Sequence, residues 1–344
     1  MDRDLIGGLL QEWGEPAYRM DQLVRAQRAG ARSWDEVTTL GKGLRARLAE
    51  HGPLWSVTPS ERLVSVDGTV KWRLGLTDGL EIEAVLIAHA RGRRTLCVSS
   101  QVGCALGCRF CSTGTMGFGR DLTTWEIVEQ ALLAAHEADT QSARLSNVVF
   151  MGMGEPMQNL LSVFSAVEEL HRPAPGLGIS ARQIAISTVG WVPGIAALQD
   201  FALPVRLAVS LHAADDETRS RMMPINHRYP ISSLLSACRR YCDSTGRRVF
   251  IEYLLLEGVN DSQADAKRLA HLLRDGRFHV NLIEYNATGG EFQGSRPQRR
   301  ELFLATLERA GLEASVRRSR GADVQAACGQ LITSSAATRI PASA

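Results

Sequence analysis

The stretch Cys104-Ala105-Leu106-Gly107-Cys108-Arg109-Phe110-Cys111 places three cysteines at C-x3-C-x2-C spacing, with no fourth cysteine nearby. Structural zinc and saturated electron-transfer clusters normally take four Cys or His ligands. Three thiolates can instead hold three irons of a cubane cluster and leave the fourth iron open, which favours chemistry over electron storage. The small residues that follow would let the backbone approach such a cluster closely: Ser112, Thr113, Gly114 and Gly117. The alternative is three structural or surface cysteines that meet this spacing by chance.

The composition is that of an ordinary globular protein, long enough for one large domain and a smaller one. With 344 residues and 44% hydrophobic side chains, the chain can bury a sizeable core. No apolar run approaches the ~20 residues of a membrane helix, and the start Met1-Asp2-Arg3-Asp4 is unlike a signal peptide. Seven cysteines without secretory features indicate a reducing, cytoplasmic location and no membrane partner.

The charge balance alone does not indicate nucleic acid, because the formal net charge is only +2. Arginines nevertheless form local clusters within 91–94, 296–300 and 317–320. Each cluster alone is more typical of a solvated face than of a phosphate site, so its meaning depends on whether it borders a cleft.

The chain before residue 93 divides into two accessory parts. Residues 1–52 predict a small helical module, with Ser33-Trp34-Asp35-Glu36 as a capping box. Residues 53–92 predict a β-meander extension, because apolar residues alternate there between Asp-Gly turns. Its predicted strands are Leu63–Val66, Val70–Leu76 and Leu80–Ile87. Glu83 has apolar neighbours on its own face of the last strand, and the strand pattern alone favours a solvent-facing side chain.

Residues 93–333 alternate short apolar strands with amphipathic helices, the pattern of a parallel α/β fold. Six strands are expected, near 94–99, 147–151, 183–187, 205–210, 249–255 and 279–285. Helix starts are indicated by a Thr123-x-x-Glu126 box and by the acidic run at 215–217. Several of these strands carry one polar face, as Thr95, Cys97 and Ser99 do, whereas a sheet covered on both sides should be apolar throughout. The prediction is therefore a partial six-unit (β/α) barrel with a polar lumen, followed by a flexible tail at 334–344.

Polar residues follow the ends of the predicted strands, where α/β barrels gather their reacting groups. Gly152-Met153-Gly154-Glu155-Pro156 follows the second strand, and this stretch does not fit a dinucleotide fingerprint. It is better interpreted as backbone lying close to a ligand, with Gly154 and Glu155 able to bind an ammonium group. Further candidates follow later strands: Ser187, Ser210-Leu211-His212 and Asn286. His212 could equally be a satisfied core histidine.

The motifs together resemble the RlmN/Cfr-like radical-SAM RNA methyltransferases over residues 5 to 332. The resemblance rests on Thr95–Cys104, the triplet, Gly152–Pro156, Ser210–His212, Pro224–Asn226 and Ala326–Leu331, which occur in the expected order. It implies a radical-SAM form of the partial barrel, with one 4Fe-4S cluster held by Cys104, Cys108 and Cys111. It also implies methylation of an adenine ring carbon, C2 in the housekeeping branch and C8 in the resistance branch. The expected partners are 23S ribosomal RNA, transfer RNA and an electron donor such as flavodoxin or ferredoxin, and the protein is expected to be a monomer.

The resemblance further implies two catalytic thiols outside the cluster and two molecules of S-adenosylmethionine (SAM) per methyl transferred. Cys328 would accept a methyl from the first SAM, and the deoxyadenosyl radical from the second would activate that methyl for addition to the base. Cys97 would then attack the sulfur of Cys328, which releases the methylated RNA and leaves a disulfide. Glu83 matches the family's proposed proton acceptor. The implied SAM contacts are Gly154, Glu155, Ser187, Ser210, Leu211, His212 and Asn286.

Three alternatives remain open. Another radical-SAM reaction on the same barrel would not need the pair Cys97 and Cys328. A divergent paralogue could act on adenine C8 or on another RNA, since Asn286-Ala287-Thr288-Gly289-Gly290 lacks the prolines usual in that family's turn. The third alternative is a non-catalytic RNA-binding protein stabilised by zinc. Such a protein would be colourless, whereas one with an iron–sulfur cluster would be brown. Cys238 and Cys242 are interpreted as two packed thiols of one helix.

Overall fold

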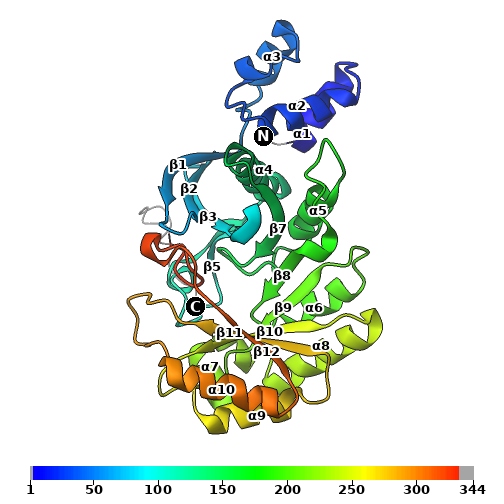
Figure 1. Cartoon of the computed structure of the whole chain (residues 1–344). Coiled ribbons are helices and arrows are strands. Elements are labelled where there is room, and N and C mark those ends of the chain that lie inside the picture. Colours follow the sequence, from blue (N-terminus) through cyan, green and yellow to red (C-terminus); the bar gives the residue numbers. More distant parts are fainter. Residues whose placement is uncertain (1–2, 333–344) are drawn as a thin grey trace.

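The computed structural model describes residues 3–332, and Figure 1 shows them as one long curved sheet with helices on its outer side. The strands run as β1 (Val57–Val64), β2 (Val70–Leu76), β3 (Glu81–Ala88), β4 (Arg93–Cys97), β5 (Gln101–Cys104), β6 (Gly117–Asp121), β7 (Arg144–Phe150), β8 (Ile184–Thr188), β9 (Arg206–Ser210), β10 (Val249–Leu255), β11 (Phe278–Glu284) and β12 (Glu313–Arg317). The helices run as α1 (Arg3–Glu12), α2 (Tyr18–Arg28), α3 (Lys42–Ala49), α4 (Thr124–Thr140), α5 (Leu160–His171), α6 (Val192–Gln199), α7 (Asp216–Met222), α8 (Ile231–Thr245), α9 (Gln263–Leu273) and α10 (Pro297–Arg309).

The large sheet confirms the predicted partial α/β barrel. Its order within the described residues is β1-β2-β3-β4-β7-β8-β9-β10-β11-β12, and β1 and β12 are its two edges, so the barrel stays open. Within this sheet the strands from β4 to β12 pair in parallel, while β5 and β6 form a separate antiparallel pair. The six predicted strands are all present, and β12 adds a further parallel strand that the sequence analysis did not anticipate.

The two faces of the barrel strands differ in polarity for a packing reason. On β10, Tyr253 packs against Phe303 of α10 with ring centroids 5.2 Å apart, so this face is the apolar core. Glu252 and Leu254 point the other way, into the lumen, where they line a cavity. Because side chains alternate along a strand, this register places polar groups inside the barrel.

The N-terminal part contains the predicted helices, but the proposed capping box at Ser33 is wrong. Residues Trp34–Glu36 form a single 3-10 turn, and the Ser33 side chain caps no backbone N–H. Glu36 instead accepts a hydrogen bond from the backbone N–H of Arg32 at 3.0 Å. The helix begins later, at Lys42, because the chain is extended at Gly41.

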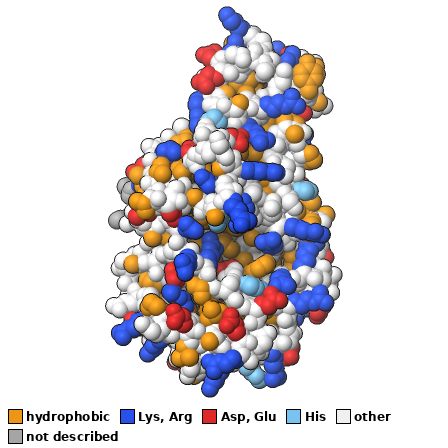
Figure 2. All heavy atoms as spheres, in the orientation of Figure 1, with side chains coloured by type: hydrophobic (Ala, Val, Ile, Leu, Met, Phe, Trp, Pro, Cys, Tyr) orange, Lys and Arg blue, Asp and Glu red, His pale blue; other side chains and the backbone are white. Residues whose placement is uncertain are grey.

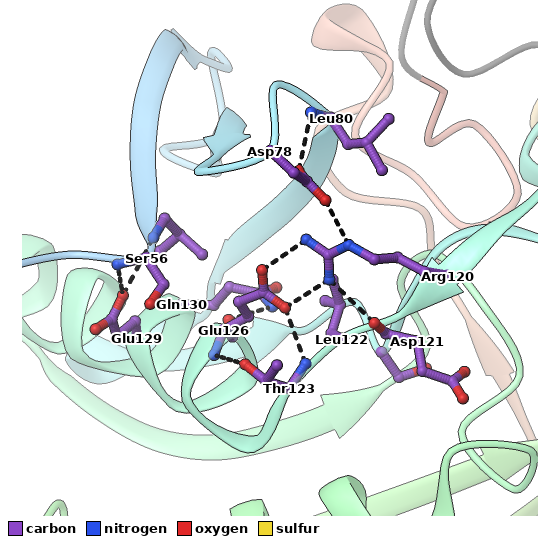
Figure 3. Close-up of polar contacts among 12 residues, drawn as sticks. Ser56, Asp78, Leu80, Arg120, Asp121, Leu122, Thr123, Glu126, Glu129 and Gln130 are labelled. Carbon is purple, nitrogen blue, oxygen red and sulfur yellow. Dashed lines mark hydrogen bonds and ion pairs between the residues drawn. The ribbon is translucent and has the colours of Figure 1, made fainter. Parts of the chain in front are cut away.

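The meander has its three antiparallel strands, and β1 begins at Val57, earlier than predicted. Arg120 links this meander to the barrel (Figure 3). Its guanidinium contacts Asp78 in the β2–β3 turn at 2.6 Å and Glu126 at 2.8 Å. Glu126 also completes the predicted capping box with Thr123 at the start of α4. The barrel's first helix and the meander are therefore held by one arginine. No helix within residues 3–332 combines the length and apolar character that a membrane crossing requires.

Candidate active site

The three cysteines of the triplet line one cavity inside the barrel mouth. Cys104 ends β5, and Cys108 and Cys111 lie in the loop that follows it. The predicted strand-end residues Gly154, Ser187, Ser210 and His212 line the same cavity, as does Glu155. Three strand ends that are far apart in the sequence, those of β7, β8 and β9, therefore meet the cysteine triplet, as expected for an α/β barrel.

Glycines allow the cavity wall to pack closely. A Cβ at Gly114 would lie 2.8 Å from the carbonyl oxygen of Cys108, so no side chain fits against the cysteine loop. Gly154 has φ of +97°, and a Cβ there would lie 2.5 Å from the side chain of Gln101. Both positions require glycine for space, and Gly154 also requires it for backbone conformation.

The chemistry of the donor set fits an iron–sulfur cluster. Burial raises the pKa of Cys104 to about 12, and burial also raises the pKa values of Cys108 and Cys111. Such thiols become thiolates readily only when they bind metal, which displaces their protons. Within residues 3–332, no three His, Cys, Asp or Glu side chains are placed to ligate a single ion. Thiols spread around a cavity wall suit a polynuclear cluster better than one zinc ion.

Glu155 ties two strand ends together beside the triplet. Its carboxylate accepts hydrogen bonds from the backbone N–H groups of Met157 at 3.0 Å and Val189 at 2.9 Å. Burial raises the pKa of Glu155 to about 7. The side chain therefore shapes the loops after β7 and β8, and its remaining lone pairs are available to a ligand.

His212 is held in one orientation and in its neutral form. Its Nδ1 accepts a hydrogen bond from the backbone N–H of Leu254 at 3.0 Å. Burial, assisted by the charge of Arg219, lowers the pKa of His212 to about 3. A neutral ring whose Nδ1 is an acceptor carries its hydrogen on Nε2, so it can offer a ligand only a donor. Phe110 of the cysteine loop meets this ring edge-on, with centroids 4.8 Å apart.

Arg219, which the sequence analysis did not single out, organises the loops behind the cavity. The side chain is fully buried and donates to the carbonyl oxygens of Val189, Ser210 and Leu211. It also donates to Asn226, in the motif at 224–226. Leu211 is therefore buried behind the cavity wall, where its main chain bonds Arg219 and Glu252.

A second cavity adjoins the first and contains the other two predicted thiols. Cys97 lies at the end of β4 and Cys328 lies in the C-terminal segment, and both are free. Asn286 also lines this cavity and donates to the carbonyl oxygen of Cys328 at 3.3 Å. Cys328 and Arg317 line both cavities, so the two spaces meet at these residues.

A thiol that acts as a nucleophile must become a thiolate, which a positive neighbour favours, and Arg317 is such a neighbour of Cys97. Burial raises the pKa of Cys97 to about 12 and nearby Cys328 adds to this, while Arg317 acts in the opposite direction. The charge of Arg317 is secure, because Cys328 raises the pKa of this arginine. A guanidinium between two thiols stabilises whichever of them becomes a thiolate.

Glu83 is buried, and the interpretation of a solvent-facing side chain is wrong. Only 1% of Glu83 is exposed, and its carboxylate pairs with Lys71 at 2.9 Å. It also accepts a hydrogen bond from the backbone N–H of Ile332 at 2.9 Å. The physical reason is that the C-terminal segment covers this face of the meander, and Lys71 also donates to the carbonyl oxygen of Gln325. Burial raises the pKa of Glu83, which Lys71 partly offsets.

The arginine clusters have different surroundings. Figure 2 shows Lys and Arg side chains gathered around a hollow near the middle of the visible face. Arg317, Arg318 and Arg320 line the second cavity, so this cluster borders a cleft. The cluster on α10 instead forms ion pairs, Arg296 with Glu257, Arg299 with Asp261 and Arg300 with Glu284. On α8, Cys238 and Cys242 are both buried in the core, as interpreted from their spacing.

Comparison with known proteins agrees with this geometry. Residues 98–270 match the Radical SAM superfamily. The chain is 49% identical to the probable dual-specificity RNA methyltransferase RlmN of Moorella thermoacetica, covering 95% of this chain and 96% of that protein. It is 47% identical to the dual-specificity RNA methyltransferase RlmN of an Anaeromyxobacter species, over 95% and 88% of the two chains.

A solved structure shows the same fold. The crystal structure of a radical SAM methyltransferase from Sphaerobacter thermophilus superposes with a TM-score of 0.91 at 46% identity, over 95% of this chain and 96% of that one. The cysteine triplet, the strand-end residues around it and this likeness along nearly the whole length lead to one conclusion. The chain belongs to the RlmN/Cfr-like family of radical-SAM RNA methyltransferases.

Proposed function

We propose that this protein methylates C2 of an adenine in 23S ribosomal RNA, with transfer RNA as a second substrate class, through a methyl carried on Cys328 and resolved by Cys97. The observation that carries the proposal is the arrangement of Cys97, Cys328 and Arg317 around one cavity, directly beside the cysteine-triplet cavity. A radical enzyme that only abstracts hydrogen does not need two further thiols at this place.

The target atom explains the need for this arrangement. Adenine C2 lies between two ring nitrogens and is electron-poor, so it does not displace a methyl from SAM. When bound, the cluster and SAM supply the carbon radical that such a ring accepts. Cys328, at the junction of the two cavities, is placed to present a methyl group to both the SAM side and the RNA side.

Release of the product is the proposed task of Cys97. After addition, a thioether joins Cys328 to the RNA. The Cys97 sulfur attacks the Cys328 sulfur, an S–S bond forms and the S–C bond breaks. The electron pair of the broken bond remains on the methylene carbon, which takes up a proton and becomes the methyl group. Arg317 supports this step by stabilising the attacking thiolate. An external reductant of the thiol or flavin class must then restore the two thiols.

Glu83 is the proposed acceptor of the proton lost from the adenine ring, and the one electron that the radical adduct must also lose would return to the cluster, which supplies one-electron chemistry when bound. Its raised pKa makes its carboxylate a better base than an exposed one. The carboxylate is held by Lys71 and by the backbone of Ile332, close along the chain to Cys328. This contact couples the base to the segment that carries the methyl group.

SAM is proposed to bind the seven residues that the family resemblance indicates, with two molecules used per methyl and electrons supplied by a flavodoxin or ferredoxin. Gly154, Glu155, Ser187, Ser210 and His212 support this by lining the triplet cavity. Leu211 is fully buried and lines neither cavity, so its part is to hold the neighbouring Ser210 and His212 in place, and Asn286 would act from the adjoining cavity. Arg318 and Arg320 are proposed to contact RNA phosphates at the second cavity.

The test is mass spectrometry of nucleosides from ribosomal and transfer RNA of cells with and without this gene. The proposal expects 2-methyladenosine in the parent and its loss from the deletion strain, with recovery when the gene is returned. Loss of 8-methyladenosine would identify the C8 alternative instead. Identical nucleoside profiles in the two strains would contradict RNA methylation by this protein.

A further inference from the structure

Glu252 is a buried carboxylate in the triplet cavity that the reaction described above does not use. It lies on β10, only 3% exposed, and it lines the cavity together with Cys104, His212 and Arg317. One oxygen, Oε1, accepts a hydrogen bond from Asn281 Nδ2 at 2.9 Å. The other oxygen, Oε2, has no hydrogen-bond partner within the described part of the chain. A buried acceptor without a donor is costly, so a ligand group is expected to supply one.

A chain of side chains fixes which oxygen of Glu252 is free. Asn281 Oδ1 accepts from the Ser315 hydroxyl at 3.0 Å, and Ser315 in turn contacts His279 Nε2 at 2.9 Å. Because the Glu252 carboxylate can only accept, the Asn281 amide nitrogen faces it, and the Ser315 hydroxyl donates to the Asn281 oxygen. The network therefore holds Oε1 as an acceptor and directs Oε2 to the cavity.

Arg317 offers the complementary group on the same wall. Its one polar contact among the described residues is from Nη1 to the Met151 sulfur at 3.3 Å, and no carboxylate pairs with it. In the pairing of β10 with β11, Glu252 lies opposite Asn281. In the pairing of β11 with β12, Arg317 lies opposite Ile283, which is two residues beyond Asn281. Two strand spacings and two residues separate the backbones by about 12 Å. Both side chains line the triplet cavity, and among the described residues they form no ion pair with each other.

We propose that Glu252 and Arg317 bind the edge of an adenine base, with Glu252 accepting a hydrogen bond from the exocyclic N6 amino group and Arg317 donating to ring nitrogen N7, which hypoxanthine shares. An amino donor beside a ring-nitrogen acceptor is the pattern that adenine presents. The gap between a carboxylate and a guanidinium has the matching acceptor and donor. The inference deepens the proposed function, on which it rests, because both SAM and the RNA substrate bring an adenine to this cavity.

The substitution Glu252→Gln tests this pairing because it replaces an acceptor with a donor at the position of Oε2. Asn281 still donates to the side-chain oxygen, so the new amide nitrogen takes the place of Oε2. A donor then faces the adenine amino group, which is unfavourable, whereas it suits the 6-oxo group of hypoxanthine. The expected signature is a change in preference between the two bases. Such a ratio is measured within one variant, so a lower fraction of folded protein does not affect it.

Two arms distinguish the source of the adenine. The RNA arm uses the Cys97→Ala protein, which is expected to trap a covalent adduct, and a synthetic anticodon stem-loop RNA with adenine or hypoxanthine beside the anticodon. The cofactor arm measures equilibrium dialysis of SAM and of its hypoxanthine analogue, S-inosylmethionine, against reconstituted protein. Glu257→Gln is the matched control, because Glu257 pairs with Arg296 at the surface and lines neither cavity.

The proteins with Glu252 should prefer adenine by about tenfold, the value of one good hydrogen bond to a charged group. Glu252→Gln should lose or reverse this preference, and Glu257→Gln should keep it. A change in the RNA arm alone assigns the site to the substrate, and a change in dialysis alone assigns it to the cofactor. Unchanged preferences in both arms overturn the inference. If the Cys97→Ala parent forms no adduct with any RNA, the proposed function fails separately, and the dialysis arm alone decides the role of Glu252.

Discussion

The cysteine loop, residues 104–117, and the Cys328 segment, residues 321–332, carry the two sets of functional thiols but are built in different ways. Hydrogen bonds within the loop join close neighbours, as from Gly114 N–H to the carbonyl oxygen of Cys111. The Cys328 segment is held by residues far away in the sequence. Asp323 accepts from the Ser65 hydroxyl at 2.6 Å, and Thr113 donates to the carbonyl oxygen of Leu331 at 2.6 Å.

Because of this difference, a substitution can disrupt the function of one region and spare the function of the other. The loop takes its three cysteines from one short stretch of sequence, although Ser112 N–H donates to the carbonyl oxygen of Gly329 in the segment. The segment depends on the meander, the loop and the residues after β11 for its position. Figure 1 shows the segment returning from β12 across the open side of the sheet to lie near β1, β2 and β3. Damage to these distant contacts should therefore affect Cys328 and leave the cluster site intact.

The largest expected effect comes from removing thiols of each region. Replacing Cys104, Cys108 or Cys111 with Ala should abolish iron binding and SAM cleavage, because a cubane cluster of roughly four irons needs all three protein ligands. Cys328→Ala should retain iron and lose the methyl on the protein, and with it the methylation of RNA. The measurements are iron content, 5′-deoxyadenosine release and the mass of the protein. Undiminished SAM cleavage by all three triplet variants would contradict the cluster assignment.

A second test breaks the contact between the meander and the Cys328 segment. Lys71→Met should cost about 3 kcal/mol in the free energy of unfolding, because it leaves the buried Glu83 carboxylate without its partner. Urea unfolding measures this loss, and adding Glu83→Gln should recover part of it. Amide hydrogen exchange should accelerate in residues 321–332 and remain unchanged in residues 104–117 except at Ser112, whose N–H donates to the carbonyl oxygen of Gly329 in the segment. Equal acceleration in both regions would refute their independence.

A third test depends on pH and concerns His212, which packs against Phe110 of the cysteine loop. His212 has a pKa of about 3 in the folded protein, below its usual 6.5, so only the unfolded chain takes up its proton just below pH 6.5. Its contribution to stability is therefore complete above pH 6.5 and falls as the pH decreases, by about 1.4 kcal/mol per pH unit and about 2 kcal/mol by pH 5.

His212→Asn should remove this part of the pH dependence. Asn tolerates the φ of +57° at this position and can still accept from the backbone N–H of Leu254. Urea unfolding of the cluster-free protein at pH 7 and pH 5 compares the two. A variant that loses as much stability as the parent between these values would show that His212 is not the titrating group.

The same contrast explains what the sequence could predict. Local patterns predicted the cysteine triplet, the capping box at Thr123 and Glu126, and six of the barrel strands, because each is specified by residues a few positions apart. Strand-end polarity also predicted that Gly154, Ser187, Ser210 and His212 share a cavity, since parallel strands end at one edge.

Residues whose surroundings come from distant pairing were missed or misinterpreted. Arg317 lies on β12, whose place in the sheet depends on pairing with β11, so its spacing in an arginine cluster could not show that it faces two thiols. Glu252 was not singled out, because in the sequence it is one polar residue in an otherwise apolar strand. The strand pattern made Glu83 appear solvent-facing because it contains nothing about the segment around Ile332 that covers it.

The most direct test of the two-thiol account is the fate of Cys97→Ala incubated with SAM, a reductant and RNA. Without the resolving thiol, the protein should stall as a covalent adduct that survives denaturant and shifts on a gel. Nuclease digestion should leave a nucleotide mass on the peptide that contains Cys328, and Cys328→Ala should form no adduct. Normal turnover by Cys97→Ala, or Cys328 found without a methyl in protein from cells that supply SAM, would contradict the account.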